Sequence, residues 1–527
     1  MFYSILKNWR NYRNFYVSKY LSIISIMLIA FVYSVKAQIT PQDAVKGMAR
    51  GINIGNTMEP PTEGGWNNPP VKQRAFDDYK NAGFTAIRIP ITWDKHTLNY
   101  PPYTIDAAWL DRVEQVVDWG LQRGLFIIIN AHHESWIKNW YSDSTVARFD
   151  SIWSQIATRF KGKSDSLIFE ILNEPDSMSA ANVNSLNAQV LKIIRQTNPT
   201  RIVSFSGYMW SNSDQLVTAA IPDTSDKYLI GYYHSYDPYP FGLKGTGTYG
   251  TTADINATKA KFDQVTAWSK RNNIPVILDE FGYIDTADYN SRMCAYGTVM
   301  DQALSHGVGT FAWDDGGSFP IYNRTTFGFN EVKDILIHTY PESPSGMKIS
   351  QLNGNSIKVQ WHNRNIENDS IVIQRRIGNG SFSDYSVVAP SDSQFIDIAT
   401  TPGNSYYYRL KIIMKDSVEV QSYPVMIHDI ATSVKTSSPP FHFYLYNNYP
   451  NPFNPSTEIS FSLKESEKVT LKVYNILGQE VALLVNQEMT AGQHSVKFVG
   501  NGLSSGVYIY KLNAGSFSSI KKMVLQK

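Results

Sequence analysis

Short apolar runs alternate with amphipathic stretches from residue 41 to about residue 340. Most of these runs are continuously apolar, which is typical of strands covered on both faces. Between two of them, residues 106–120 predict a helix with Asp106 as its N-cap. Eight runs predict strands: 51–56, 86–90, 125–130, 167–172, 201–206, 229–233, 275–279 and 309–313.

Eight strands separated by helices favour an α/β fold of the (β/α)8 TIM-barrel type. The alternative is a doubly wound open sheet, which usually carries a glycine-rich phosphate loop after its first strand. Residues 51–56, Gly-Ile-Asn-Ile-Gly-Asn, do not have that glycine spacing. The sequence therefore predicts a barrel domain over residues 38–342.

Beyond Pro344 the pattern changes to short, mostly alternating strands separated by turns. Residues 343–430 predict an all-β sandwich, and Trp361 followed later by a tyrosine run favours a fibronectin type III-like one. Other small sandwiches, including carbohydrate-binding modules, give similar patterns. Residues 431–442 are rich in Ser, Thr and Pro and predict a linker to a last β-rich module over 443–527.

The N-terminus predicts a secretory signal peptide over residues 1–37. Four basic residues precede the apolar stretch 21–35, and Val35-Lys36-Ala37 offers small residues for cleavage. An uncleaved membrane anchor is the alternative, but the stretch is short for a span and contains three serines.

Composition adds little beyond this. A length of 527 residues suggests about three domains. The net charge of +2 argues against nucleic acid or an anionic membrane surface as partner. The 12 Trp and 32 Tyr suit stacking on sugars, although β-rich domains also use Tyr. The single cysteine, Cys294, excludes an intramolecular disulfide and is expected to be a small buried hydrophobe.

Two glutamates lie at the ends of apolar runs. Glu174 follows the fourth predicted strand in Asn173-Glu174-Pro175, and Glu280 follows the seventh. In a (β/α)8 barrel the active site is built at the C-terminal ends of the strands. Two carboxylates acting on one bond are what hydrolysis of a glycoside requires. The pair therefore predicts a glycoside hydrolase.

From about residue 51 to residue 330 the chain resembles glycoside hydrolase family 5, in the clan whose acid and nucleophile follow strands four and seven. Residues 51–59 and 100–103 are most similar to thermophilic endo-β-1,4-glucanases, some of which also cut mannan. The resemblance implies that Glu174 is the general acid and then the base, and that Glu280 forms a covalent glycosyl-enzyme. Retention of configuration follows, with the carboxyl groups about 5–5.5 Å apart.

The resemblance also implies roles for the residues around this pair. Arg88 would keep Glu280 ionised, while the less compensated Glu174 keeps its proton. Asn173 would bind the sugar 2-hydroxyl, Tyr236 would bind Glu280, and His234 would join the acid/base network. The other expected substrate contacts are Trp313 under the sugar at the cleavage subsite, His132 and His133 beside it, and Asn56, Glu59 and Trp66 at more distant sugars.

Two local features need separate interpretation. A metal site at His132-His133-Glu134 is disfavoured, because zincin histidines are four residues apart and adjacent strand residues diverge; no metal or cofactor is expected. Position 279 is commonly Gly in the family and is Asp here. Since neighbouring strand residues face opposite ways, we expect Asp279 to point into the strand–helix layer. Turned inward, it would raise the pKa of Glu280.

Several motifs between residues 449 and 510, such as Val473-Tyr474-Asn475-Ile476-Leu477-Gly478-Gln479, resemble the C-terminal sorting domain of proteins exported by the type IX secretion system. A further binding sandwich is the alternative. The resemblance implies that the secretion machinery is a partner and that the protein is secreted or attached to the outer cell surface.

Together these features predict a secreted, monomeric, retaining endo-β-1,4-glucanase. Its expected partners are β-linked polysaccharides, namely cellulose, β-glucan and mannan. One alternative is a mannanase or xyloglucanase of the same fold. The other is a surface protein that binds polysaccharide without cutting it.

Overall fold

The computed structural model describes residues 38–352, 355–364, 370–413, 418–428, 443–446, 448 and 450–527. The predicted signal peptide (1–37) and linker (431–442) lie outside the described residues. No helix in the described part of the chain is both long enough and apolar enough to cross a membrane. The chain divides into two compact units, residues 1–431 and 432–527.

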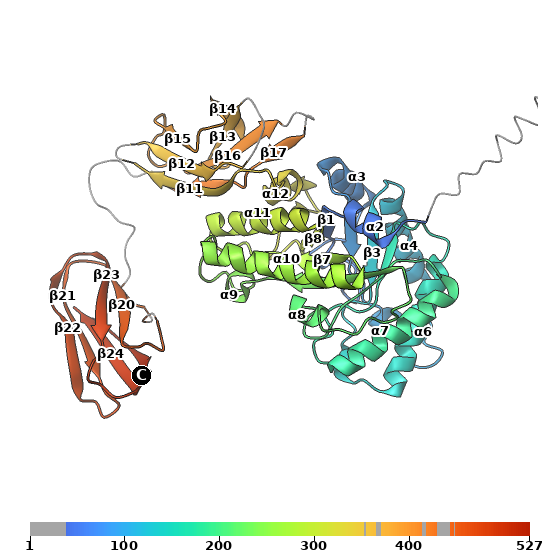
Figure 1. Cartoon of the computed structure of the whole chain (residues 1–527), viewed down its shortest axis with the longest axis horizontal. Helices are drawn as coiled ribbons and strands as arrows, with labels where there is room; N and C mark the ends of the chain where they lie inside the picture. The colour runs from blue at the N-terminus through green and yellow to red at the C-terminus, as the bar shows by residue number, and fades with distance from the viewer. Residues whose placement is uncertain are drawn as a thin grey trace, which may run out of the picture. The chain divides into compact units, whose positions relative to one another are not determined.

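Eight parallel strands close into a barrel in chain order, which confirms the predicted fold (Figure 1). Each predicted strand is present, and most of the observed strand ends lie within two residues of the predicted ones. The strands are β1 (Gly51–Asn53), β2 (Ala86–Ile89), β3 (Phe126–Asn130), β4 (Leu167–Glu170), β5 (Val203–Phe205), β6 (Leu229–Ser235), β7 (Val276–Phe281) and β8 (Gly309–Ala312).

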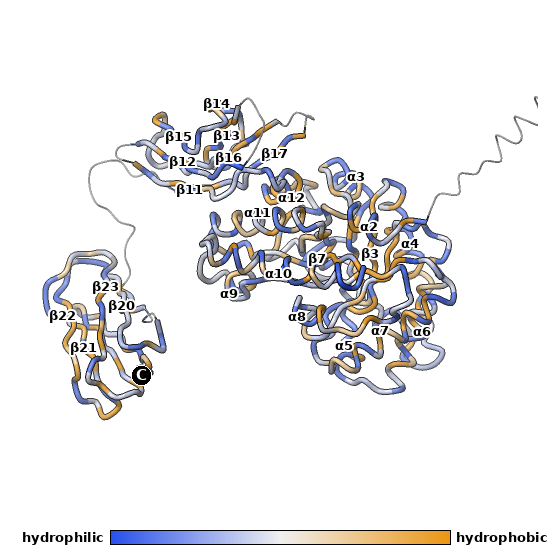
Figure 2. Tube along the Cα trace, in the orientation of Figure 1, coloured by the Kyte–Doolittle hydropathy of each residue, from blue (hydrophilic) through white to orange (hydrophobic). Residues whose placement is uncertain are grey.

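Helices cover the barrel, and along their length apolar and polar residues alternate at helical spacing, as Figure 2 shows for the outer helices. The predicted cap is confirmed: Asp106 accepts hydrogen bonds from the first turn of α4. The helices are α2 (Pro41–Gly47), α3 (Gln73–Ala82), α4 (Ala107–Leu121), α5 (Ser135–Asn139), α6 (Asp143–Phe160), α7 (Ala180–Thr197), α8 (Ser213–Leu216), α9 (Tyr239–Gly242), α10 (Thr252–Asn272), α11 (Tyr289–His306) and α12 (Val332–His338).

The barrel interior changes from apolar to polar along the strands. Ala86, Ile128, Ile168 and Ile277 belong to one buried cluster, together with residues of α2. Two residues further on, and therefore on the same face of each strand, come polar residues that are all buried. These are Arg88, Asn130, Glu170 and Asp279. A belt of buried polar side chains thus underlies the C-terminal rim of the barrel.

Residues 345–427 form two antiparallel sheets that pack beside the barrel within the first unit. One sheet has the order β11-β12-β15, the other β14-β13-β16-β17, with β18 also paired to β16. This agrees with the predicted sandwich; its fibronectin type III-like character stays a prediction. The strands are β11 (Ser345–Gln351), β12 (Ile357–His362), β13 (Ile371–Ile377), β14 (Ser383–Val388), β15 (Gln394–Asp397), β16 (Tyr406–Ile413), β17 (Glu419–Gln421) and β18 (Val425–Ile427).

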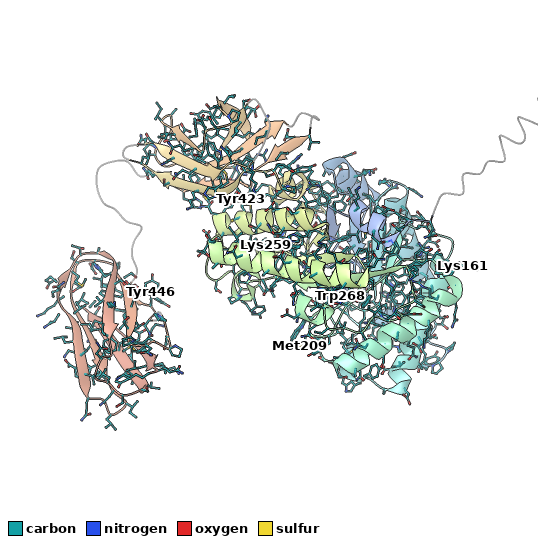
Figure 3. All side chains as sticks on the ribbon, viewed as in Figure 1. Lys161, Met209, Lys259, Trp268, Tyr423 and Tyr446 are labelled. Atoms are coloured by element: carbon teal, nitrogen blue, oxygen red, sulfur yellow. The ribbon has the colours of Figure 1, made fainter. Side chains whose placement is uncertain are left out.

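The sandwich is joined to the barrel helices by specific contacts. Tyr423, labelled in Figure 3, packs against α11, where a Cβ on Gly297 would lie 2.6 Å from its ring. Asn290 of α11 exchanges two hydrogen bonds with the backbone of Met426, at 2.7 and 2.9 Å. These contacts make the sandwich part of the same body as the barrel.

The second unit is a small β-module with its own core. It consists of a sheet of order β19-β20-β23 and a sheet of order β22-β21-β24-β25. Apolar residues from both sheets, such as Phe461 and Leu471, form one buried cluster. The strands are β19 (Tyr444–Leu445), β20 (Ser456–Leu463), β21 (Glu467–Tyr474), β22 (Glu480–Met489), β23 (Gly492–Val499), β24 (Gly506–Ala514) and β25 (Phe517–Leu525).

Candidate active site

The structure brings Glu174 and Glu280 together at the C-terminal rim of the barrel. Glu280 lies near the end of β7, and Glu174 follows β4. The backbone of Glu174 has a φ of 41°, a left-handed conformation that is uncommon for a residue with a side chain. A strained conformation of this kind persists only where the surrounding structure holds it, and such residues cluster at functional sites.

The Glu280 carboxylate is held at both oxygens. Nη1 of Arg88 donates to Oε2 at 2.9 Å, and the hydroxyl of Tyr236 donates to Oε1 at 2.7 Å. Nδ1 of His234 lies 3.8 Å from Oε2. The structure therefore places Arg88 and Tyr236, the two groups expected beside Glu280, in contact with it, and places His234 next to it.

The Glu174 carboxylate lies across from Glu280 and is more open. Its Oε1 is 2.9 Å from Nδ1 of His234, and its side chain is 26% exposed. One oxygen of each glutamate and one nitrogen of His234 lie within 4.8 Å of one another. Although this set has the donor types of a metal site, the oxygens are already paired with His234 and Arg88, and we do not assign it to a metal.

Arg88 is the centre of the buried belt. It forms a two-pronged ion pair with Glu170, at 2.6 and 2.7 Å, and also donates to Asn173 at 2.7 Å and to Asn53 at 2.9 Å. Glu170 and Asn53 were not predicted as site residues. The sequence held one signal for Glu170, since it is a charged residue inside an otherwise apolar run.

In the sugar-free protein the pKa shifts of Glu174 and Glu280 run opposite to the expected ones. Burial raises the pKa of Glu174, but the hydrogen bond and charge of His234 outweigh burial and lower it overall. Burial raises the pKa of Glu280, and the lowering effects of His234 and Arg88 do not fully offset it. Burial lowers the pKa of His234, but the charges of Glu280 and Asp279 raise it to about 10. Between Glu174 and His234, these shifts favour the proton on His234 at neutral pH.

The expectation that Asp279 points away from the site is also wrong. Asp279 is in phase with Ile277, which faces the barrel interior. The pairing of β7 with β6 then skips Asp279, because Tyr233 pairs with Leu278 and His234 with Glu280. Such an irregularity re-aims a side chain, so Asp279 and Glu280 both reach the site.

Imidazole and indole rings form the rest of the site wall. The rings of His132 and Trp313 are nearly parallel, with centroids 6.0 Å apart, and His133 meets His132 edge-on at 4.5 Å. Trp66 lies 5.7 Å from His133 and is 46% exposed. Burial lowers the pKa of His133 to about 4 and that of His132 well below its usual value. Both imidazoles are therefore neutral surfaces at neutral pH.

Two carboxylates near the site have structural partners. Glu134 accepts hydrogen bonds from the backbone of Trp93 at 2.6 Å and from the indole of Trp136 at 2.7 Å. Glu59, expected at a distant sugar, is 2% exposed and accepts from the backbone of Asn56 and of Thr57. The structure thus places Glu59 inside its own loop, and Trp66 is the more exposed member of that group.

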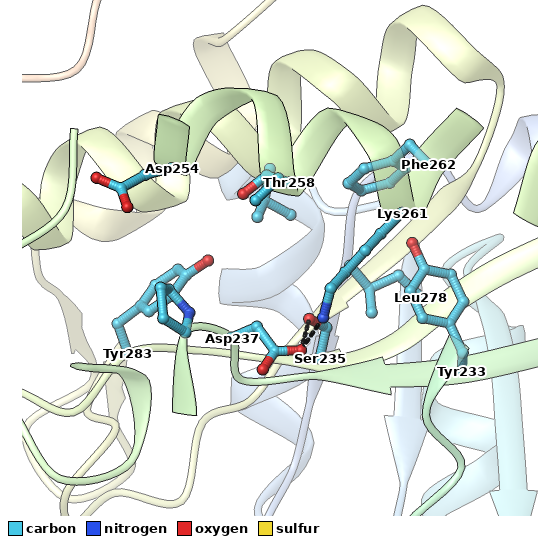
Figure 4. Close-up of a pocket in the computed structure, with 12 residues that line it drawn as sticks. Tyr233, Ser235, Asp237, Asp254, Thr258, Lys261, Phe262, Leu278 and Tyr283 are labelled. Carbon is cyan, nitrogen blue, oxygen red and sulfur yellow. Dashed lines mark hydrogen bonds and ion pairs between the residues drawn. The ribbon is translucent and has the colours of Figure 1, made fainter. Parts of the chain in front are cut away.

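A separate cavity of about 240 Å³ lies behind the rim, between α10 and strands β6 and β7 (Figure 4). Its lining includes Tyr233 and Leu278, whose in-sequence neighbours His234 and Asp279 face the barrel interior. Asp237 and Lys261 form an ion pair beside it. The cavity therefore belongs to the strand–helix layer and not to the carboxylate site.

Comparison with known proteins places this geometry in context. Residues 47–318 match the family model described as cellulase (glycosyl hydrolase family 5), and residues 447–526 match that of the secretion system C-terminal sorting domain. Endoglucanase H of Acetivibrio thermocellus is 47% identical over 313 residues, which are 58% of this chain and 34% of that protein. The chain thus matches a minor part of that curated relative's length.

Solved structures give the same picture. Thermotoga maritima Cel5A, an endoglucanase whose structure contains a mannotriose substrate, is 31% identical with a TM-score of 0.54, over 56% of this chain and all of that one. A tri-modular family 5 endo-β-1,4-glucanase of Bacillus licheniformis is 24% identical with a TM-score of 0.63, over 92% of this chain and all of that one. At that identity the second likeness concerns the fold alone.

Proposed function

The chain belongs to glycosyl hydrolase family 5, and we propose that it is a retaining endo-β-1,4-glucanase with Glu280 as nucleophile and Glu174 as acid/base. The observation that carries this proposal is the approach of the two carboxylates, which have oxygens within 4.8 Å of each other. Retaining enzymes have carboxyl groups about 5–5.5 Å apart, whereas inverting enzymes need about 6.5–9.5 Å to admit a water. The short separation therefore supports double displacement.

In the first step, an oxygen of Glu280 attacks the anomeric carbon, and the bond to the leaving oxygen breaks. Arg88 and Tyr236 hold the attacking carboxylate in place. Glu174 gives a proton to the leaving oxygen. Since the pKa shifts favour the proton on His234 in the sugar-free protein, Nδ1 of His234 first returns it to Oε1 of Glu174 across their 2.9 Å contact.

In the second step, Glu174 is a carboxylate and takes a proton from water. The resulting hydroxide attacks the anomeric carbon, and the bond to Glu280 breaks, so that the sugar leaves with its original configuration. The partial exposure of the Glu174 side chain supports this role, because water and the leaving group must both reach it.

Substrate contacts follow from the ring surfaces at the rim. Trp313 offers a platform for a sugar face, and Trp66 is exposed further along the same wall. Asn173 has its Oδ1 held by Arg88, which leaves its amide nitrogen to donate to a 2-hydroxyl. Glucans are the primary substrate class, and mannan is a second one because Thermotoga maritima Cel5A was crystallised with mannotriose.

The C-terminal module supports an exported enzyme. Residues 447–526 carry the secretion sorting domain, and the resemblance of their motifs supports export by the type IX system. We propose that the protein is secreted or held at the outer surface, where polymeric substrates are accessible.

The test is the hydrolysis of carboxymethylcellulose, barley glucan, glucomannan, xyloglucan and xylan by the wild type and by Glu280→Ala. We expect the wild type to release reducing ends from β-1,4-glucans, and the rate of release to fall at least about a thousandfold in Glu280→Ala. NMR of the wild-type product should show retention of the anomeric configuration. Glu342→Ala, at an exposed position, is the matched control and stays active. Substantial hydrolysis by Glu280→Ala would contradict the mechanism. Binding without hydrolysis by the wild type would identify a polysaccharide-binding protein instead.

A further inference from the structure

Asp279 is a buried acid that takes no part in the two proposed reaction steps. Its side chain is fully buried, and neither of its carboxyl oxygens has a regular hydrogen bond among the described residues. An isolated buried carboxylate is costly unless a cation compensates it. The groups around Asp279 therefore decide what this charge does.

Two cationic groups lie beside Asp279. Nε2 of His234 is 3.2 Å from Oδ1, and Nε of Arg88 is 3.8 Å from Oδ2. Arg88 already donates to Glu170 and Glu280 at 2.6–2.9 Å. His234 is thus the closer cation to Asp279. Their contact is an ion pair, but the N–H of His234 does not point at Oδ1 as it would in a regular hydrogen bond.

His234 connects Asp279 to the acid/base. Its Nε2 faces Asp279 and its Nδ1 faces Glu174 at 2.9 Å, so one ring lies between two carboxylates. With a proton on each nitrogen, the imidazolium satisfies both neighbours. If the ring lost one proton, either Glu174 or Asp279 would be left beside a bare nitrogen lone pair.

We propose, on the basis of the hydrolase function above, that Asp279 is a positioning residue that keeps the catalytic proton on the His234–Glu174 pair and thereby extends hydrolysis to higher pH. The reaction needs this proton on the leaving oxygen, so activity falls when the pair loses it. An anion 3.2 Å from the ring opposes that loss.

The protonation of Asp279 itself limits the effect to the alkaline side. Burial and the charge of Glu170 raise the pKa of Asp279 to about 7. Asp279 gains its negative charge as the pH rises through this range, so the anion stabilises the imidazolium mainly on the alkaline side. The charged and titratable groups that interact with His234 from the surrounding elements are His132, Glu170, Glu174, Tyr232, Asp279 and Glu280. Arg88 pairs with three of these carboxylates, Glu170, Asp279 and Glu280.

The test is the pH dependence of kcat/KM for the full-length wild type and for Asp279→Asn on a soluble β-glucan. Loss of an opposite charge at this distance changes a pKa by about one to three units, so we expect the alkaline limb to move to lower pH by at least about one unit. The acidic limb stays within a few tenths of a unit. The imidazole 15N resonances of His234 should report the same fall in its pKa.

Asp301→Asn is the matched control, because Asp301 is a buried carboxylate whose partner is Arg364, at 2.6 Å. It should leave the alkaline limb unchanged. An unmoved limb in folded Asp279→Asn, or a moved limb with an unchanged His234 pKa, would overturn the proposal. If Asp279→Asn does not fold, the wild type decides: a His234 that titrates near its ordinary value overturns the proposal, and one that titrates well above it supports it.

The two proposals fail in different ways. If the wild type hydrolyses no polysaccharide, the proposed function is wrong, whereas the 15N titration of His234 in both proteins still shows whether Asp279 holds its proton. If the wild type hydrolyses glucan and the titration is unaffected by Asp279→Asn, only the role of Asp279 is wrong.

Discussion

At the scale of single residues, the site is a balance of buried charges. Four carboxylates, Glu170, Glu174, Asp279 and Glu280, lie around the cations Arg88 and His234. Removing one member leaves another charge buried without its partner, which typically costs about 3–5 kcal/mol. The site therefore has to be considered as one titrating group, in which the position of each proton depends on every neighbour.

Tyr236 allows one member of this group to be tested alone. Its hydrogen bond lowers the pKa of Glu280, so Tyr236→Phe should raise that pKa and move the acidic limb of kcat/KM to higher pH. We also expect kcat/KM at the optimum to fall about 100-fold, as for the loss of one preorganised donor. The measurement is a pH–rate profile with a soluble β-glucan.

Tyr233→Phe is the matched control for this substitution. The hydroxyl of Tyr233 is buried in the strand–helix layer without a hydrogen-bond partner among the described residues. Its removal should leave both limbs in place. An acidic limb that shifts equally in both variants would show that the effect does not come from the bond to Glu280.

At the scale of elements, irregular backbone shapes the rim. The irregular pairing of β7 allows Asp279 and Glu280 to face the same side, although they are adjacent. After β1, Gly55 lies where a Cβ would be 2.8 Å from the ring of Trp313 and 3.0 Å from the carbonyl oxygen of Asp314. The position of the Trp313 ring thus depends on a glycine, Gly55, in the loop after β1.

Gly55→Ala should displace the Trp313 ring. Overpacking of this kind costs about 1–3 kcal/mol, and we expect kcat/KM to fall about tenfold through a higher KM, because the sugar platform moves while the carboxylates stay. Steady-state kinetics and denaturant unfolding measure the two effects. Gly162→Ala, where nothing lies within 4 Å of the added Cβ, is the control. A lower kcat at unchanged KM would contradict a role in binding.

At the scale of the whole molecule, the two β-rich parts differ in how they relate to the barrel. The sandwich shares one unit with the barrel and contacts α11 and α12 through Tyr423, the Arg364–Asp301 ion pair and the Arg409–Asp334 ion pair. The C-terminal module is a separate unit with its own core. The sandwich thus belongs to the same compact unit as the barrel.

Two truncations test this difference. A chain ending at residue 431 should keep the activity and melting temperature of the barrel. A chain ending at residue 342 loses the interface with α11 and α12, and its Tm should fall by at least about 5 °C. Differential scanning calorimetry compares the two. Equal melting temperatures would show that the sandwich does not stabilise the barrel.

Much of the fold and of the site could be predicted from local patterns. Continuous apolar runs indicate strands covered on both sides, and the eight runs are the eight barrel strands. The position of Glu174 and Glu280 after two of these runs was enough to predict that they lie at one rim, because the C-terminal ends of parallel barrel strands are all on the same side of the barrel. Glu170 was missed, since a charge within a strand does not reveal which cation it faces.

The sequence by itself determined the barrel, the order of the β-rich modules and the two glutamates, because periodicity and strand ends are local properties. Only the tertiary structure decided the inward turn of Asp279, the burial of Glu59 in its loop and the raised pKa of His234. These depend on strand register and on charges that come together from β2, β4, β6 and β7. A pKa is set by all charges within a few ångströms, and distance along the chain does not give that set.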